Sequence, residues 1–334
     1  MAGPRIHLHI GRNKAGSTSL QDFFLAERDT LAAAGLRYCL FGHLHDSVPG
    51  VLGFPTQLEL ADHARAGAER AYLVSNEFMF GWPLDYTDSM ATWLAEFDVR
   101  IIAYIRPYGA WIRSAYADAV KNGENSRDFD RYLDWMAPRI SAWPYLQGWG
   151  EAFGWDRIRI RSLDPRDLVG RDLIADCLTA LDLAPALATG AGRSNLAPDW
   201  PVVEMLRQLI TRDDEAGWQP EARRIADPLR ALMTGCLAET PVPPIEYLTT
   251  AQAQSLADLY NRDLELLAER TGVALQPERP TGRDRGAVPD FQQIPPDLRA
   301  RWAARAAAPE FRRDHPEAAD AAARLSALRF RLPP

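Results

Sequence analysis

The feature that most constrains the fold of this 334-residue chain is an apolar stretch that leads, through a glycine-containing loop, into an amphipathic helix. Residues 6–10 are typical of a short buried strand, and Ser17 is a good N-cap for the helix. Gly35 is suited to end that helix. Its apolar face is made by residues three or four positions apart: Leu20, Phe23, Phe24 and Leu31. The segment therefore predicts a strand–loop–helix unit.

Four more strands are predicted, with helical stretches between them. They are residues 36–41, 72–75, 99–105 and 157–161. Strands that alternate with helices favour an α/β fold with a central, mostly parallel sheet, here of about five strands. Ligands of such sheets bind beyond the carboxyl ends of the strands. The loops to inspect therefore begin at Gly11, Ser75 and Arg106.

The second half of the chain is mostly helical from about Leu163 onward. Residues 277–296 are rich in Pro, Gly and Arg, which indicates a linker or strap. Residues 299–328 are rich in Ala and Arg and favour helix. We expect one domain at 1–275, with an α/β core at about 5–165 and a helical remainder. Residues 276–334 would form a strap and a helical extension of undefined role.

Composition excludes several classes of protein. The net charge of −7 argues against a nucleic-acid partner. The cysteines (Cys39, Cys177, Cys236) form no CxxC pair, which argues against a disulfide framework or a zinc site. The sequence shows neither the apolar core of a signal peptide nor the roughly 18 apolar residues of a membrane span. We expect a cytoplasmic protein without membrane insertion, and the oligomeric state stays open.

The loop at 11–19 has the composition of an anion site. A turn from strand to helix directs backbone N–H groups at one point, where the helix dipole adds about half a positive charge. Lys14, Ser17, Thr18 and Ser19 supply further donors. Gly11 and Gly16 match the spacing of the nucleotide P-loop GxxxxGK[ST], but the lysine stands inside the loop. No aspartate ends an apolar strand to hold magnesium, so an ATP-dependent kinase is the lesser alternative.

A second phosphate contact is predicted at the end of strand 99–105. Arg106 ends the strand, and Pro107 suits the first turn of a helix. Ser114 then lies about two turns into that helix. The arginine and the serine hydroxyl can flank one phosphate, to which arginine offers bidentate, charge-assisted bonds.

The run HIGRNKAGSTSLQ resembles the 5′-phosphosulfate-binding loop of the sulfotransferases that use 3′-phosphoadenosine 5′-phosphosulfate (PAPS), particularly bacterial and carbohydrate-type members. Their loop usually reads K-[TS]-G-[TS]-[TS], and here Ala15 replaces a hydroxyl residue. The resemblance implies a P-loop-like three-layer fold and a lysine, Lys14, that stabilises the leaving phosphate. The implied nucleotide contacts are Arg12, Asn13, Lys14, Ala15, Gly16, Ser17 and Thr18.

The pair Arg106 and Ser114 resembles the 3′-phosphate motif of the same family, in which serine follows arginine after eight residues. Pro107 comes one position earlier than in the commoner Arg-x-Pro. Many members also close a basic loop over the nucleotide, and Arg193 is the candidate here. The resemblance covers roughly residues 6–200.

Sulfuryl transfer needs a base that takes the proton of the acceptor. Glu77 follows strand 72–75 and resembles the SxE glutamate of carbohydrate sulfotransferases; the alternative is a glutamate that caps the next helix or pairs with a loop arginine. His43 and His45 are the second candidates. His7 and His9 lie within the first strand, and we interpret them as sheet residues rather than metal ligands. No metal site is expected.

We therefore expect a sulfotransferase that moves a sulfuryl group from PAPS to a hydroxyl or amine and releases PAP. The sequence identifies no acceptor, although a glycan, a lipid-linked sugar or a small metabolite suits the acidic chain better than a sulfated polymer. The tryptophans concentrated at 82–155 could stack on an acceptor, but such residues more often form core. The alternatives are a P-loop kinase-like phosphotransferase and a non-catalytic nucleotide-binding scaffold.

Overall fold

The computed structural model describes residues 4–41, 52–54, 56–66, 70–187, 199–213, 220–284 and 293–326. The chain forms two compact units, each made of separated segments. The first unit contains residues 1–111, 139–196 and 254–280. The second contains residues 112–138, 197–253 and 281–334. The boundary near residue 275 inferred from composition stays a prediction.

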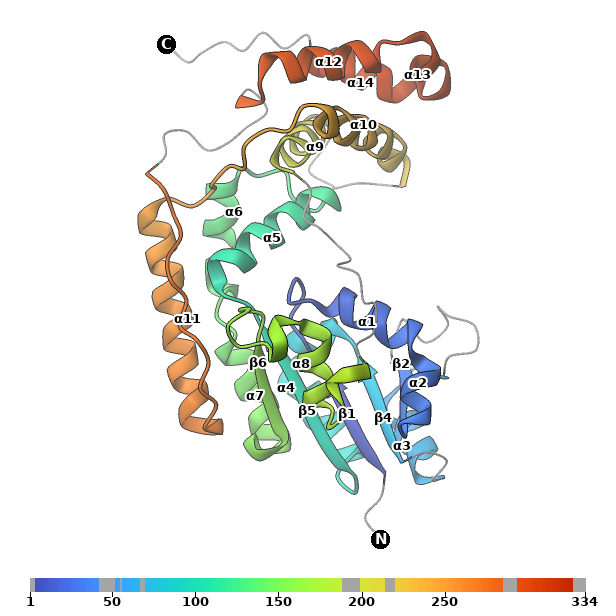
Figure 1. Cartoon of the computed structure of the whole chain (residues 1–334), viewed down its shortest axis with the longest axis vertical. Helices are drawn as coiled ribbons and strands as arrows, with labels where there is room; N and C mark the ends of the chain where they lie inside the picture. Colours follow the sequence, from blue (N-terminus) through green and yellow to red (C-terminus); the bar gives the residue numbers. More distant parts are fainter. Residues whose placement is uncertain are drawn as a thin grey trace. The chain divides into compact units, whose positions relative to one another are not determined.

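The first unit is built on a sheet of six parallel strands (Figure 1). The strands are β1 (Arg5–His9), β2 (Leu36–Phe41), β3 (Leu52–Phe54), β4 (Ala71–Ser75), β5 (Asp98–Ile105) and β6 (Ile158–Ser162), in the order β3-β2-β4-β1-β5-β6. The prediction of a parallel α/β sheet is confirmed. The sequence missed β3, because three residues are too few to show an alternating pattern.

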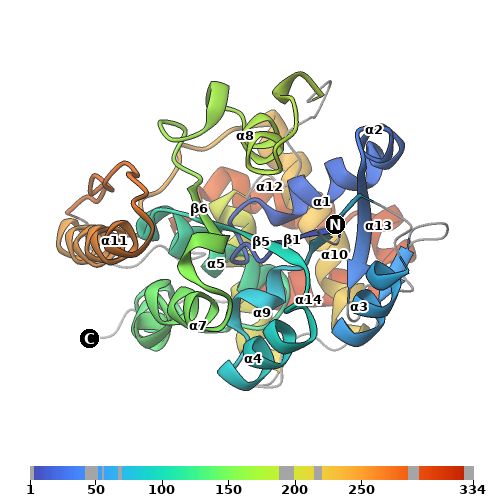
Figure 2. The ribbon, with the colours of Figure 1, turned by 90° about the horizontal axis from the view of Figure 1, so that it is seen from below.

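Helices cover both faces of this sheet. Figure 2 shows α1, α2 and α8 on one face and α3, α4 and α7 on the other. Their bounds are α1 (Ser17–Ala26), α2 (Arg28–Ala33), α3 (Gln57–Arg65), α4 (Leu84–Trp93), α7 (Trp143–Phe153) and α8 (Leu173–Ala180). Short 3-10 helices are η2 (Glu77–Gly81), η3 (Ala137–Arg139), η4 (Trp155–Arg157), η5 (Val169–Arg171) and η6 (Pro185–Leu187). The first unit therefore has three layers: helices, the sheet, and helices.

The first helix packs as its apolar spacing predicts. Leu20 and Phe24 are fully buried against β2 and β5, together with α8, and each contributes about 1.5–3 kcal/mol of hydrophobic stabilisation. The predicted single helix is instead α1 and α2, because the backbone leaves helical geometry at Glu27. Gly35 follows α2 with a φ of 86°, the left-handed conformation that glycine adopts at a helix end.

The second unit is helical. It contains most of α5 (Tyr108–Lys121), together with α6 (Phe129–Met136), α9 (Trp200–Asp213), α10 (Pro220–Glu239), α12 (Pro296–Ala306), α13 (Pro309–Asp314) and α14 (Pro316–Ser326). Met205, Leu229 and Trp302 are buried in it. α11 (Thr250–Thr271) belongs mainly to the first unit. Of the helices in the described ranges, each is too short or too polar to cross a membrane.

Candidate functional site

The carboxyl ends of three neighbouring strands carry the predicted site residues of the first unit. β1 lies between β4 and β5, with His9 opposite Ser75 and Ile102. The chain therefore crosses β1 when it passes from β4 to β5. Such a reversal of strand order opens the crevice in which parallel α/β sheets bind ligands. The loop after β1, Glu77 after β4 and Arg106 after β5 all begin at this edge.

The loop between β1 and α1 has a constrained backbone. Lys14 has a φ of 62°, a left-handed conformation that costs a non-glycine residue about 1–2 kcal/mol. The N–H of Ala15 donates to the carbonyl of Arg12 at 3.0 Å, and the N–H of Arg12 donates to the carbonyl of Tyr104 at 3.4 Å. A lysine held in this conformation marks a position where the surrounding structure imposes the geometry.

At both glycine positions of the loop, Gly11 and Gly16, the structure leaves no room for a side chain. A Cβ atom at Gly11 would lie 2.6 Å from Nε2 of the buried His9. Gly16 has a φ of 82°, and its Cβ would lie 2.5 Å from the side chain of Leu173. Burial lowers the pKa of His9 to about 4, so its ring is neutral near pH 7. Its Nδ1 lies 2.7 Å from Oγ of Ser75, and this contact joins β1 to β4.

The first turn of α1 can receive an anion. Gly16 stands at the N-cap position and supplies no side-chain cap, and the first turn, Ser17-Thr18-Ser19, carries no carboxylate. The first amides of a helix have no acceptor within the helix, and the dipole makes this end positive. Thr18 is exposed beside these amides. The anion cradle itself stays a prediction.

Glu77 lies next to this cradle. Its carboxylate accepts a hydrogen bond from the hydroxyl of the buried Ser17, at the start of α1. Asn76, rather than Glu77, caps the turn that follows β4, because its Oδ1 accepts from the N–H of Phe78 at 3.0 Å. Glu77 is half-buried. Glu77 is the first residue of η2, and its carboxylate bonds to the start of α1 rather than capping η2.

The end of β5 holds the middle of the loop. The Arg106 guanidinium donates to the carbonyl of Lys14 at 3.1 Å, and the indole N–H of Trp111 donates to the carbonyl of Asn13 at 3.0 Å. Arg106 is thus brought to the loop that carries Lys14. Ser114 lies on α5, three residues beyond Trp111, in the second compact unit, and its phosphate contact stays a prediction.

Arg12 has a different environment from the one expected for a nucleotide contact. Its buried guanidinium lies 3.4 Å from the ring centroid of Trp111 and donates to the carbonyls of Arg139 and Ile140, both at 2.6 Å. The side chain therefore anchors the loop to residues more than 120 positions away. No local pattern could have indicated these acceptors.

Sequence reasoning also missed Glu278. Its carboxylate accepts the first two amides of α5, from Tyr108 at 2.7 Å and from Gly109 at 2.9 Å. This residue lies in the Pro-rich stretch that composition marks only as a strap. The start of α5, directly after Arg106, is therefore capped by a carboxylate from the chain itself.

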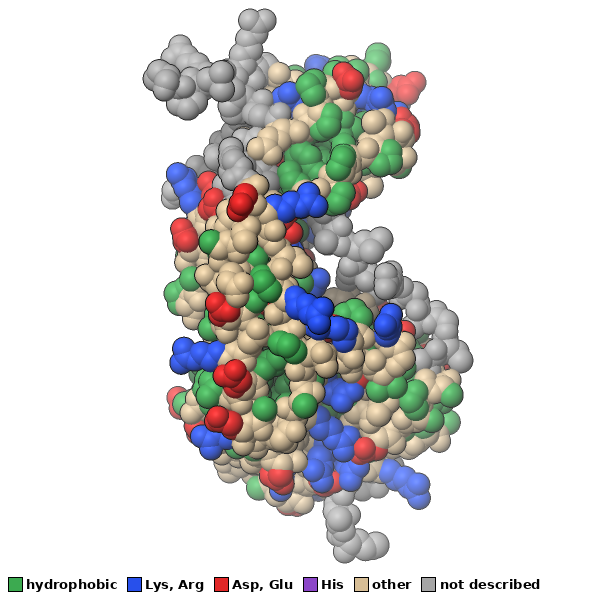
Figure 3. Space-filling view, turned by 60° about the vertical axis from the view of Figure 1, so that its left-hand side comes forward, with side chains coloured by type: hydrophobic (Ala, Val, Ile, Leu, Met, Phe, Trp, Pro, Cys, Tyr) green, Lys and Arg blue, Asp and Glu red, His purple; other side chains and the backbone are tan. Residues whose placement is uncertain are grey.

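Several other candidates lie elsewhere. His43, His45 and Arg193 fall outside the described residues. His7 and His9 are buried in β1. Within the described ranges, no group of three or more His, Cys, Asp or Glu side chains could hold a metal ion. Both signs of charge are spread over the face in Figure 3.

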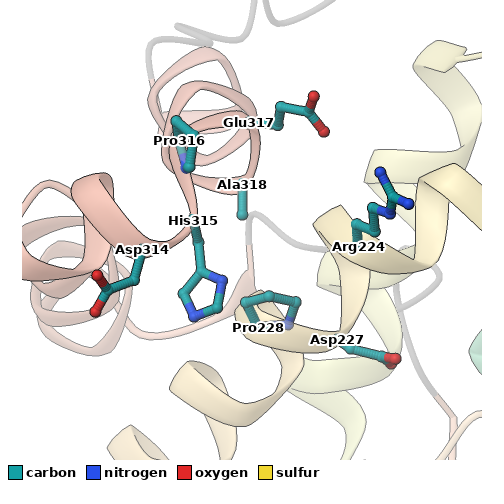
Figure 4. Close-up of a pocket in the computed structure, with 8 residues that line it drawn as sticks. All are labelled: Arg224, Asp227, Pro228, Asp314, His315, Pro316, Glu317 and Ala318. Carbon is teal, nitrogen blue, oxygen red and sulfur yellow. The ribbon is translucent and has the colours of Figure 1, made fainter.

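A pocket of about 590 Å³ lies within the second unit. Figure 4 shows Arg224 and Glu317 facing one another across it, while Asp314 points away. It contains none of the residues that the sequence singled out.

Comparison with known proteins finds remote likenesses in structure. No protein-family model and no curated protein matches this chain. The chain is similar in structure to a sulfotransferase from Alicyclobacillus acidocaldarius, with 14% sequence identity, a TM-score of 0.41, and coverage of 82% of this chain and 98% of the other. It is also similar to mouse sulfotransferase SULT7A1 complexed with PAP, with 14% identity, a TM-score of 0.37, and coverage of 71% and 85%. At this level of identity the likenesses establish no reaction for this chain.

Proposed function

We propose that this protein is an enzyme that transfers a sulfuryl group from PAPS to a hydroxyl or amine acceptor and releases PAP. The observation that carries the proposal is the start of α1. An uncapped helix end, with Lys14 inside its loop, lies beside a carboxylate from β4 and a guanidinium from β5. These are the groups that an anionic donor and a proton-losing acceptor require.

The chemistry is an in-line substitution at sulfur. A bond forms between the acceptor oxygen or nitrogen and sulfur, while the bond between sulfur and the bridging phosphate oxygen breaks. Glu77 takes the acceptor proton, and Lys14 stabilises the negative charge that develops on the leaving phosphate. In the unliganded protein Glu77 accepts from Ser17. Donor binding at the helix end would recruit the Ser17 hydroxyl and free the carboxylate for the acceptor.

The remaining contacts concern the nucleotide. The backbone from Asn13 to Thr18 would surround the phosphosulfate, and Arg106 with Ser114 would bind the 3′-phosphate. Arg193 is proposed as the basic residue that closes over the nucleotide. For Arg12 we propose an indirect part, because its guanidinium already binds two backbone carbonyls.

The acceptor class is the least constrained part of the proposal. We propose a neutral glycan, a lipid-linked sugar or a small hydroxylated metabolite, and a cytoplasmic location where PAPS is available. An acidic chain of net charge −7 would repel a heavily sulfated polymer.

A thermal-shift experiment separates the candidate donors. The purified protein is heated with PAP, or with ATP and magnesium, at equal concentrations. Stabilisation by PAP alone is expected, since a ligand that binds only the folded state raises the melting temperature. Stabilisation by ATP–magnesium alone would overturn the proposal and favour a P-loop kinase.

Turnover is then measured with PAPS labelled with sulfur-35 and a panel of glycans, lipids and phenols. Transfer of label to an acceptor supports the enzyme. PAP binding without transfer or hydrolysis across the panel would instead indicate a nucleotide-binding scaffold.

A further inference from the structure

A short segment of the first unit, residues 139–143, lies between a buried cation and a buried carboxylate. On one side, the Arg12 guanidinium donates to the carbonyls of Arg139 and Ile140. On the other side, Asp263 of α11 accepts the N–H groups of Ala142 at 2.8 Å and Trp143 at 3.1 Å. The carbonyl groups of the segment therefore point at the cation and its N–H groups point at the carboxylate. Both charges favour this same orientation of the peptide groups.

Asp263 collects further donors. It is 2% exposed, and it accepts hydrogen bonds from the hydroxyls of Ser141, at 2.8 Å, and Tyr108. α7 begins at Trp143 without a side-chain cap from its N-cap residue, so Asp263 serves that helix end from another helix. A buried carboxylate keeps its charge only where hydrogen bonds of this kind replace water.

Tyr108 joins this cluster to the nucleotide site. It opens α5, two residues after Arg106, and its ring centroid lies 5.8 Å from the Arg12 guanidinium. Burial, together with the neighbouring Asp263, raises the pKa of Tyr108 well above its ordinary value. The hydroxyl therefore keeps its proton and donates to Asp263 throughout the physiological range.

We propose that Asp263 is a positioning residue for the nucleotide loop. It would act through residues 139–143 on the Arg12 guanidinium, and through Tyr108 on the junction that carries Arg106. Arg12 in turn supports Trp111, whose indole donates to the carbonyl of Asn13 in the loop. α11 lies well over 200 residues from the loop in sequence and would set its geometry without touching the nucleotide. The inference rests on the proposed function.

A double-mutant cycle tests this connection. PAP affinity is measured by calorimetry for the wild type, Asp263→Asn, Arg12→Lys and the double variant. We expect each single variant to bind PAP about tenfold more weakly, and the double variant little more weakly than either, because residues in one network are not additive. Independent losses that multiply to about a hundredfold would contradict a shared path. Tyr108→Phe removes one donor to Asp263 and should give a smaller loss of the same kind.

The matched control is Leu267→Ala. Leu267 is fully buried on α11, one turn beyond Asp263, and its loss destabilises the same helix without removing a charge. We expect lower stability in urea but unchanged PAP affinity. If Leu267→Ala weakens PAP binding as much as Asp263→Asn does, Asp263 has only a structural role.

Amide hydrogen exchange of the unliganded proteins supplies a readout that needs no nucleotide. Asp263→Asn should increase exchange at residues 10–17, and Leu267→Ala should not. A wild-type protein that fails to bind PAP would overturn the proposed function, while the exchange pattern would still decide the positioning role. Unchanged exchange at 10–17 in Asp263→Asn would overturn the positioning role even where PAP binds.

Discussion

Two helices, α1 and α5, begin at the same edge of the sheet, each after a central strand. They differ in what binds the first turn. α1 starts at Ser17, after the N-cap Gly16, with no side-chain cap and no carboxylate in its first turn. α5 starts with two amides bound to the carboxylate of Glu278. The dipoles make both ends positive, but the carboxylate at α5 binds backbone amides, whereas the carboxylate at α1, that of Glu77, accepts from the Ser17 hydroxyl. This difference indicates where the phosphosulfate would bind and leaves the 3′-phosphate to side chains such as Arg106.

Loss of the loop lysine should produce the largest effect. Lys14→Ala is expected to lower kcat by about 10²–10³-fold while PAP affinity changes much less, because the ammonium acts mainly on charge that develops in the transition state. Steady-state kinetics and calorimetry measure the two quantities. Lys121→Ala, at the chain's only other lysine, is the control and should leave both unchanged. Equal losses in kcat and affinity would make Lys14 a ground-state anchor.

The proposed base beside α1, Glu77, provides the second test of this helix end. Glu77→Gln should lower turnover by about 10²–10⁴-fold with PAP binding intact, since the amide still accepts from Ser17 but cannot take a proton. Turnover close to that of the wild type would transfer the role to another group, such as His43 or His45.

The stability of the protein should depend on pH through His9, which packs under the loop before α1. His9 has a folded pKa of about 4 and an ordinary pKa of 6.5, so the unfolded chain binds its proton first as pH falls. The contribution of neutral His9 to the free energy of unfolding is present above about pH 6.5 and is lost as the pH falls toward 4. The total loss is roughly 3 kcal/mol, at 1.36 kcal/mol per pKa unit. Urea unfolding between pH 7 and pH 4 measures the slope. His9→Gln should reduce the slope without abolishing it, because burial also lowers the pKa of His7 to about 4, and an equally steep profile would exclude His9 as a source.

The arginine after β5 should act mainly on affinity. Arg106→Ala is expected to weaken PAP binding by about 1.5–3 kcal/mol, which is typical for a hydrogen bond to a charged group. Adenosine 5′-phosphosulfate, which lacks the 3′-phosphate, should show a smaller loss in the same variant. An equal loss for both nucleotides would place Arg106 at the other phosphate or in loop support alone.

Removal of Glu278, the internal cap of α5, tests whether this carboxylate is what distinguishes the α5 end from the α1 end. Glu278→Ala should lower the free energy of unfolding by about 0.5–2 kcal/mol, as removal of a helix cap does. It should also make the melting temperature more sensitive to sulfate, because a second helix end becomes available. Glu278→Gln keeps the shape and is the milder companion. A sulfate response equal to that of the wild type would mean that the α5 end is inaccessible to anions.

Local sequence determined much of the first unit. Five strands, a helix beginning near Ser17 and the positions of Glu77 and Arg106 after strand ends could be predicted, because apolar spacing acts over a few residues. The predicted N-cap was wrong: Gly16 holds that position, and Ser17 is the first residue of the helix. Parallel pairing of those strands then brings their carboxyl ends to one edge. That rule connects Glu77 and Arg106 to the loop before any contact is known.

Only the tertiary structure decided which charged side chains bind partners within the protein. Arg12 binds carbonyls 127 and 128 residues away, Glu278 caps a helix 169–170 residues away, and Asp263 bonds to Tyr108 across 155 residues. No spacing rule relates such partners, because they meet only after the sheet and its helices have packed. For the same reason the sequence could mark both the α1 and the α5 ends as phosphate sites, and only the folded chain shows that the amides of the α5 end already bind the carboxylate of Glu278.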